Sequence, residues 1–224
     1  MAHSLILFDI DGTLVRRAGP HHRQALVDAV REVTGRKSTT EGIPVQGMLD
    51  PDILTCMMKA AGLDEETIRA AMSRVIDVAQ DVYQAEVPDL RDKTCPGVVP
   101  LLEHLTRDGR VLALVTGNLT RIGWRKLERA GLRHYFRFGA FGEMAATRGG
   151  LARLAIERAR AEKLIGPGDA VALIGDAPQD IEAAREAGAR SIAVRTGISS
   201  AGLLEALSPD LLIDDLTCLD LAVI

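Results

Sequence analysis

The chain has 224 residues, of which 47% are hydrophobic, so it can bury the core of one domain or two small ones. Its net charge of −4, its scattered Lys and Arg, and its 3% aromatic content argue against nucleic-acid binding. No apolar run approaches the roughly 20 residues of a membrane span, and the start lacks a signal-peptide pattern, so we expect a cytoplasmic protein away from membranes.

The first predicted element is a strand over residues 5–10 that leads into two carboxylates. A short apolar run is typical of a buried strand in a parallel sheet. Asp9 and Asp11 stand at its end, and Gly12 allows the chain to turn sharply there. Acids at such a position are costly to bury unless they are paired or hold a metal, and two together suit a hard cation such as Mg²⁺. A surface turn with side-chain hydrogen bonds is the alternative interpretation.

Residues 16–92 contain no convincing strand and predict helices around 20–34, 51–61 and 64–85. Apolar residues in this region recur at helical spacing. Asp50 before Pro51 is typical of a helix N-cap, with proline at the first helical position. His21 and His22 have no second metal ligand nearby in the sequence, so we expect solvated histidines at a helix start.

From Cys95 onward, helices and strands alternate, which predicts βαβ units and a parallel sheet. Helices are expected at 98–106, 119–130, 151–163, 181–187 and 203–207, and strands at 110–115, 137–141, 170–174, 191–194 and 211–213. The first strand would join this sheet. The predicted fold is therefore α/β, with a Rossmann-like, doubly wound parallel sheet interrupted by an all-helical insertion. Cys56, Cys95 and Cys218 are far apart, so we expect reduced thiols.

Two further strand ends carry polar groups. Thr116, Gly117 and Asn118 combine a hydroxyl with the free N–H groups of a helix start, which suits a phosphate. An ordinary helix cap is the alternative. Asp176 follows another apolar strand and could complete a Mg²⁺ site with Asp9. Asp180 opens the next helix, where its charge suits the helix dipole, and it could be only a cap.

These motifs resemble those of the haloacid dehalogenase-like hydrolase superfamily. Asp9-Ile10-Asp11-Gly12-Thr13 is similar to its first motif, Thr116 to its second, and Gly175-Asp176 with Asp180 to its fourth. Its third motif supplies a cation, and the segment from Arg148 to Arg158 is similar to a variant of that motif that uses Arg. The helical insertion resembles a cap. The resemblance implies a core domain at 1–15 and 93–224 and a helical cap domain at 16–92.

The resemblance implies a Mg²⁺-dependent phosphatase that acts on a small phosphorylated metabolite, similar to phosphoglycolate phosphatases. Asp9 would be the nucleophile and Asp11 the general acid and base. Asp9, the backbone carbonyl of Asp11, and Asp176 would hold Mg²⁺, while Thr116, Gly117, Asn118 and Arg148 would bind phosphate and Asp180 would support the site. Arg153 and Arg158 are expected on the surface and Trp124 in packing. A monomer or homodimer is expected.

Two alternatives remain open. A sugar-phosphate mutase of the same superfamily would retain both Asp9 and Asp11. A catalytically silent binding protein could use the same fold, because fold does not fix function. Asp11 argues against dehalogenases and phosphonatases, which lack an acid there. Ala177 stands where relatives often have Thr, which bears on a hydrogen bond near the metal site and not on the metal prediction. Leu49 stands where similar proteins often have Thr before the Asp, so the substrate is not identified.

Overall fold

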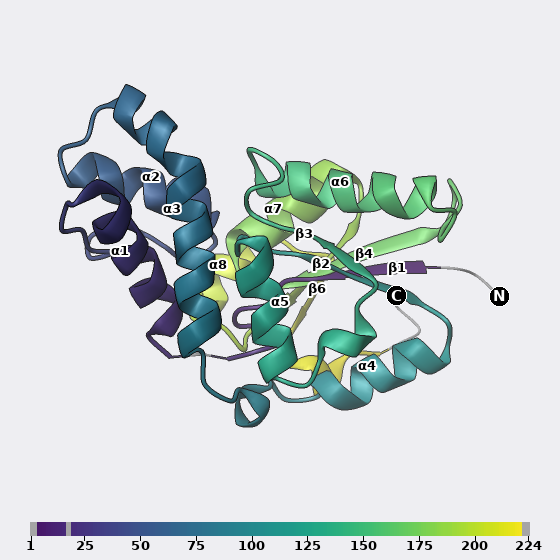
Figure 1. The fold of residues 1–224 in the computed structure, drawn as a ribbon. Helices are drawn as coiled ribbons and strands as arrows, with labels where there is room; N and C mark the ends of the chain where they lie inside the picture. The colour runs from purple at the N-terminus through teal and green to yellow at the C-terminus, as the bar shows by residue number, and fades with distance from the viewer. Residues whose placement is uncertain (1–3, 17–18, 221–224) are drawn as a thin grey trace.

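The computed structural model describes residues 4–16 and 19–220, which form a parallel sheet covered by helices and a helical block beyond the carboxyl ends of the strands (Figure 1). The strand order is β3-β2-β1-β4-β5-β6, and every neighbouring pair is parallel. The strands are β1 (Ser4–Phe8), β2 (Val111–Val115), β3 (Phe138–Ala140), β4 (Ala170–Gly175), β5 (Arg190–Val194) and β6 (Leu211–Ile213). The predicted α/β class and doubly wound sheet are confirmed.

The helices lie close to their predicted positions. They are α1 (His21–Thr34), α2 (Asp50–Ala60), α3 (Glu65–Glu86), α4 (Val98–Arg107), α5 (Thr120–Arg129), α6 (Arg148–Ala161), α7 (Pro178–Ala187) and α8 (Ala201–Ala206). Three single-turn 3₁₀ helices were not predicted: η1 (Arg91–Lys93), η2 (Arg133–Tyr135) and η3 (Leu216–Cys218). Segments this short carry no periodic signal in the sequence.

After Ser4, the central strand β1 is apolar, and helices cover both of its faces. Its side chains alternate between two buried clusters, since successive residues of a strand point to opposite faces. Leu5 and Leu7 pack with α6 and α7, whereas Ile6 and Phe8 pack with α4 and α5. The ring of Phe8 meets that of Phe136 edge to face, with centroids 5.8 Å apart. This strand therefore holds Asp9, the next residue, in a fixed place.

Two helices begin three residues earlier than predicted. The helix expected at 151–163 begins at Arg148, because the Thr147 side chain accepts a hydrogen bond from the backbone N–H of Gly150 and caps it. The helix expected at 181–187 begins at Pro178, a residue suited to the first helical turn. Both corrections place site residues at the start of a helix, where backbone N–H groups are free.

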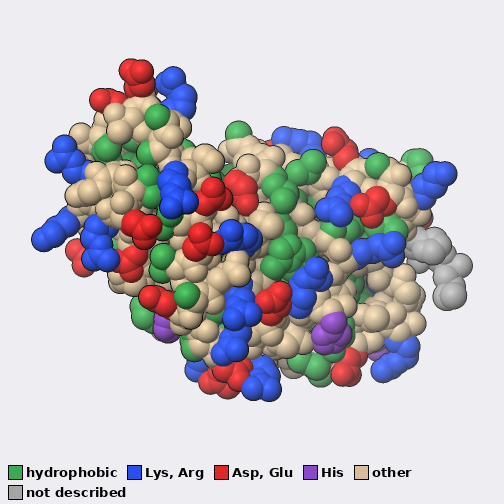
Figure 2. Space-filling model, viewed as in Figure 1, with side chains coloured by type: hydrophobic (Ala, Val, Ile, Leu, Met, Phe, Trp, Pro, Cys, Tyr) green, Lys and Arg blue, Asp and Glu red, His purple; other side chains and the backbone are tan. Residues whose placement is uncertain are grey.

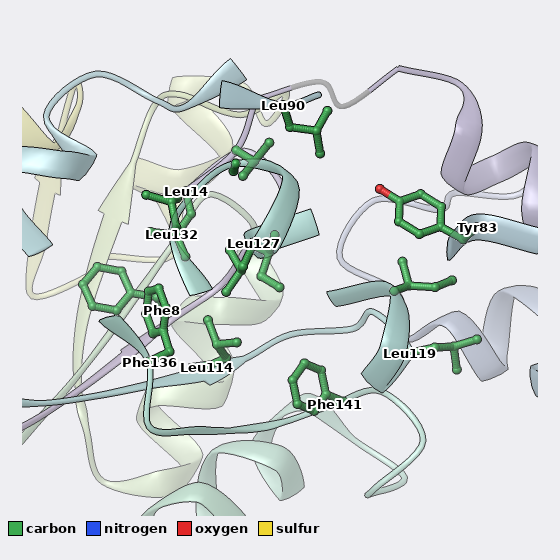
Figure 3. Packing of buried hydrophobic residues seen from close by; sticks show 14 of the residues in the cluster. Phe8, Leu14, Tyr83, Leu90, Leu114, Leu119, Leu127, Leu132, Phe136 and Phe141 are labelled. Carbon is green, nitrogen blue, oxygen red and sulfur yellow. The ribbon is translucent and has the colours of Figure 1, made fainter. Parts of the chain in front are cut away.

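The helices α1, α2 and α3 form the helical insertion between β1 and β2. In Figure 1 they stand together to one side of the sheet, and α1 packs along α3. A single buried cluster continues from the sheet into this block. Figure 3 shows it running from Phe8 and Phe136 through Leu127 and Leu119 to Tyr83 of α3. Apolar packing thus seats the insertion on the rest of the molecule.

The chain leaves the sheet for the insertion and returns from it through two segments that pair with each other. Val15 and Thr94 form an antiparallel bridge. The N–H of Arg16 donates to the carbonyl of Lys93 at 2.7 Å, and the N–H of Cys95 donates to the carbonyl of Leu14 at 3.0 Å. We call this two-stranded connection, residues 14–16 and 93–95, the stem. The stem is where the chain leaves the sheet for the insertion and returns from it.

Acidic and basic side chains intermingle on the face shown in Figure 2, as the scattered charges of the sequence predict. Arg153 pairs with Glu186, and Arg158 pairs with Glu162, both at exposed positions. All three cysteines are free, as predicted. Within residues 4–16 and 19–220, no helix combines the length and the apolar character that a membrane crossing requires.

Candidate active site

The predicted site residues that follow strands meet at the carboxyl edge of the sheet. Phe8 of β1 pairs in register with Ile174 of β4, and the N–H of Asp9 donates to the carbonyl of Ile174 at 3.0 Å. Asp9 and Asp176 therefore emerge side by side, although 166 residues of chain separate them. The strand order reverses between β1 and β4, and ligands of open α/β sheets bind at such a position.

Three buried carboxylates form the acidic part of the site. Oxygen atoms of Asp9, Asp176 and Asp180 all lie within 4.8 Å of one another. Burial raises the pKa of Asp9 and of Asp176 above the ordinary value, and repulsion between the carboxylates raises both further, while Arg148 opposes the rise. Burial and mutual repulsion disfavour the ionised form of these carboxylates until a cation offsets their negative charge. Hard oxygen donors of this kind fit Mg²⁺.

Gly12 leaves the room that Asp176 occupies. Its φ of +87° lies in the region that favours glycine, and a Cβ at this position would lie 2.5 Å from a carboxylate oxygen of Asp176. The hydroxyl of Ser199 also donates to the carbonyl of Asp176 at 2.6 Å. The glycine of the first motif thus has a packing reason as well as a conformational one.

Arg148 brings positive charge to the acidic cluster. Its Nη1 atom lies 3.2 Å from Oδ1 of Asp9 and pairs with Asp180, and only 8% of its side chain is exposed. The carboxylates raise the pKa of Arg148, although burial opposes this, so it stays charged. Asp180 also accepts a hydrogen bond from the N–H of Ala177 at 3.0 Å. Asp180 is therefore both a helix-start acceptor and the partner that orients Arg148.

The segment after β2 presents Thr116, Gly117 and Asn118 at the same edge. The Asn118 Nδ2 atom donates to Oγ1 of Thr116 at 2.7 Å and to Oδ2 of Asp11 at 2.8 Å. The carbonyl of Gly117 accepts a hydrogen bond from the N–H of Asp50 at 2.8 Å. The three residues thus connect the opening motif to the helical insertion.

Lys126, which the sequence analysis missed, is the second cation at the site. It lies on α5 with 1% of its side chain exposed, and its Nζ is 2.6 Å from Oδ2 of Asp11. Nζ also donates to Oδ1 of Asn118 at 2.6 Å. One signal could have found it: Lys126 follows Ile122 by four residues and so falls on the buried face of its helix. A lysine on an apolar face needs partners.

The prediction that His22 is solvated is wrong. The ring is largely buried, with Nε2 2.9 Å from Oδ2 of Asp50 and Nδ1 3.1 Å from Nζ of Lys126. Lys126 lies 104 positions away in the chain, so no local pattern indicates this contact. Among the residues that the structure describes, His21 has no comparable partner, and its Nδ1 atom is buried without a hydrogen bond.

The prediction that Asp50 is a helix N-cap is also wrong. The cap position is Leu49, and Asp50 is the first residue of α2. Its buried carboxylate accepts a hydrogen bond from the N–H of Leu119 at 2.9 Å, across the boundary between insertion and core. The acid makes a tertiary contact because Leu119 is the N-cap of α5, and its N–H has no partner within that helix.

Desolvation alone would raise the pKa of Asp11, but the Lys126 ammonium and the hydrogen bonds around the carboxylate outweigh it and lower the pKa. Asp11 is therefore ionised in the free protein at neutral pH. Its side chain is 43% exposed because it faces a cavity.

The cavity has a volume of about 900 Å³ and lies between the sheet edge and the helical insertion. The predicted site residues on its wall are Asp9, Asp11, Gly117, Asn118, Arg148 and Asp176. Thr116 and Asp180 are buried behind this wall. The insertion contributes Arg23, Gln46 and Met48, among others. The space fits a small metabolite. Trp124 packs against Phe141, outside the cavity lining, as predicted.

The parallel sheet with acids at its strand ends indicates a hydrolase with a Rossmann-like fold, and sequence comparison identifies its family. A sequence model of the haloacid dehalogenase-like hydrolase family matches residues 3–188. The chain belongs to this family, and the resemblance drawn from the motifs is confirmed.

Two curated relatives match nearly the whole chain. A phosphoglycolate phosphatase of Agrobacterium fabrum is 29% identical and covers 96% of this chain and 90% of its own length. A probable phosphatase, IndB, of Dickeya dadantii is 27% identical and covers 94% of this chain and 89% of its own length. Among solved structures, CbbY from Rhodobacter sphaeroides in complex with phosphate has a TM-score of 0.72 at 21% identity, covering 99% of this chain and 98% of that one. This last likeness supports the fold.

Proposed function

We propose that this hydrolase is a Mg²⁺-dependent phosphatase of small phosphate monoesters that works through an aspartyl-phosphate on Asp9. The observation that carries the proposal is the position of Asp9. Its carboxylate lies on the cavity wall, 3.2 Å from the Arg148 guanidinium and beside Asp176. A carboxylate so placed can attack a phosphoryl group whose charge the neighbouring cations offset.

The acidic cluster fits the metal that the family resemblance implies. Asp9, Asp176 and the backbone carbonyl of Asp11 would hold Mg²⁺, with Asp180 in support because its oxygen atoms already bind Arg148 and Ala177. A bound Mg²⁺ supplies Lewis-acid stabilisation of phosphoryl charge and screens Asp9 from an anionic substrate. Oxygen donors from carboxylates match its preference.

The reaction has two displacement steps. In the first, an oxygen of Asp9 attacks phosphorus, the bond from phosphorus to the ester oxygen breaks, and Asp11 gives a proton to the leaving alcohol. In the second, a water molecule attacks phosphorus and gives a proton to Asp11, and the bond to Asp9 breaks to release inorganic phosphate. Gly117, Asn118 and Arg148, which line the cavity, stabilise the phosphoryl oxygens, and Thr116 supports them from behind by accepting a hydrogen bond from Asn118.

Asp11 needs a proton to act as the acid, although its pKa is lowered in the free protein. A phosphate dianion placed beside Asp11 disfavours the ionised carboxylate and so raises its pKa. Substrate binding therefore favours uptake of the proton that the leaving alcohol then takes.

For the substrate, we propose a small metabolite with an anionic leaving group, and phosphoglycolate is the first to test. Arg16 and Arg23 line the cavity and offer cations for an anionic group of the substrate. The name of the Agrobacterium fabrum relative supports this choice.

The test is release of inorganic phosphate from a panel of small phosphorylated metabolites and a generic aryl phosphate, with Mg²⁺ present. The proposal expects release that an Asp9→Asn variant lacks. Isomerised sugar phosphate without phosphate release would instead identify a mutase. No turnover of any ester, together with tight protein partners in a pull-down, would favour a silent binding protein.

A further inference from the structure

The ammonium of Lys126 is fully engaged inside the protein. Its three N–H groups face three acceptors: the Asp11 carboxylate at 2.6 Å, Oδ1 of Asn118 at 2.6 Å, and Nδ1 of His22 at 3.1 Å. A lysine has three donors and no acceptor, so this set uses all of them. A buried ammonium matched in this way has one orientation, and so does the carboxylate that it holds.

Neighbouring hydrogen bonds fix the role of each acceptor. Nδ2 of Asn118 donates to Asp11 and to Thr116, so Oδ1 must face Lys126. Asp50 is an acceptor only, and Nε2 of His22 lies 2.9 Å from it. Nε2 therefore carries the proton of the neutral ring, and Nδ1 is free to accept from Lys126.

The contacts cross from the core to the helical insertion. Lys126 and Asn118 belong to the core, whereas His22 lies on α1 and Asp50 on α2 of the insertion. Asp50 is itself held by the N–H of Leu119, which precedes α5. The third partner of Lys126 is therefore present only while the insertion is seated on the core.

We propose that Lys126 is a positioning residue for Asp11, and that His22 and Asp50 of the insertion complete the hydrogen bonds of Lys126. The inference rests on the proposed function, in which Asp11 exchanges a proton with the leaving group and with water. Lys126 acts through Asp11: it holds the carboxylate toward the cavity through two contacts, at 2.7 and 2.6 Å. The insertion thereby helps to fix the orientation of the Asp11 carboxylate, which belongs to the core.

The experiment compares two esters in a Lys126→Met variant. An alkyl phosphate needs a proton on its leaving oxygen, whereas 2,4-dinitrophenyl phosphate loses its leaving group without one. With the alkyl ester, kcat should fall on the order of 10²-fold, the range of misplaced or lost acid catalysis. With the aryl ester, the burst of dinitrophenolate in the first turnover should keep its wild-type rate. Later turnovers should slow, since Asp11 must still activate water.

Controls come from neighbouring positions. Arg125→Met removes a cation from the same helix, one that pairs with Glu128 at the surface, and should leave both esters unaffected. His22→Leu should show the same preference for the aryl ester as Lys126→Met, to a smaller degree, while His21→Leu should not. The double variant Lys126→Met/His22→Leu should be no worse than Lys126→Met alone, because both changes act through one contact chain.

Each outcome is decisive. Equal losses on both esters, including the first-turnover burst, would assign Lys126 a structural role and overturn the proposal. Additive losses in the double variant would separate His22 from Lys126 and also overturn it. If Lys126→Met does not fold, as judged by thermal unfolding, the His22→Leu comparison decides alone. Absence of turnover in the wild type would defeat the proposed function and this inference together. If the wild type is active but the variant loses equally on both esters, only this inference fails.

Discussion

The guanidinium of Arg148 lies 3.2 Å from the carboxylate of Asp9 and also pairs with Asp180. One cation thus joins the residue that follows β1 to the first turn of α7. Removing it would leave buried acids without their counter-charge, which is more costly than the loss of one contact.

Replacing Arg148 by Met should therefore lower kcat/KM on the order of 10²–10³-fold, the range for loss of a donor that stabilises developing charge. Arg148→Lys should recover only part of this loss, because lysine lacks the planar fork. Steady-state phosphate release measures both effects. Arg153→Met is the matched control, since Arg153 is exposed on the same helix and pairs with Glu186; an equal loss there would contradict the prediction.

Asp9→Asn should abolish turnover, because an amide cannot form the aspartyl-phosphate. The measurement is phosphate release with Mg²⁺, accompanied by thermal unfolding to show that the variant is folded. Asp77→Asn, at an exposed position of α3, serves as the control and should behave as wild type. Full activity in Asp9→Asn would exclude this residue as the nucleophile.

Chelation of divalent metal should abolish activity, and Mg²⁺ should restore it. The metal-free protein should also lose stability as pH rises. Burial and mutual repulsion raise the pKa of Asp9 and Asp176. Above about pH 4, where the unfolded chain releases these protons, the folded state binds more protons than the unfolded state, so the free energy of unfolding decreases toward neutral pH.

Added Mg²⁺ should consequently raise Tm more at about pH 8 than at about pH 5, because fewer protons compete with the ion for the carboxylates at the higher pH. Thermal unfolding with and without Mg²⁺ at the two pH values tests this. Asp176→Asn removes one of the shifted acids and should weaken both the pH dependence and the Mg²⁺ response. A Mg²⁺ effect independent of pH and of this substitution would place the ion elsewhere.

Gly117→Ala should disturb the contact between residues 116–118, for which we propose phosphate binding, and the insertion. A Cβ there would lie 2.3 Å from the carbonyl oxygen of Met48, which is backbone and cannot rotate away. We expect destabilisation of about 1–3 kcal/mol, typical of overpacking, and reduced activity. Urea unfolding and phosphate release measure the two effects. Gly168→Ala is the control, because a Cβ at that glycine meets nothing within 4 Å; equal destabilisation there would contradict the steric explanation.

The strand-end residues could be predicted because their signals are local. An apolar run followed by Asp9, and another followed by Asp176, each indicates a buried strand with an acid at its carboxyl end. Parallel pairing then brings them together without further information. Arg148 was placed by its family pattern, and the structure adds that it opens α6 instead of preceding it.

Lys126, His22 and Asp50 could not be placed in the same way. Each appears within a helix or at a helix start, where polar residues are ordinarily solvated or capping. Their partners lie in different elements: 104 positions separate His22 from Lys126, and 69 separate Asp50 from Leu119. Such contacts depend on how the insertion sits on the sheet, which helical periodicity does not encode.

The stem has a consequence for how this protein can vary. The bridge between Val15 and Thr94 brings the departing and returning chain together. A loop inserted at such a point has a fixed attachment whatever its length or content. We expect that other helical blocks, grafted between residues 16 and 93, would leave β1 and its pairing with β4 undisturbed. A library of such grafts would test different substrates on one unchanged core, provided that each graft restores a partner for Lys126.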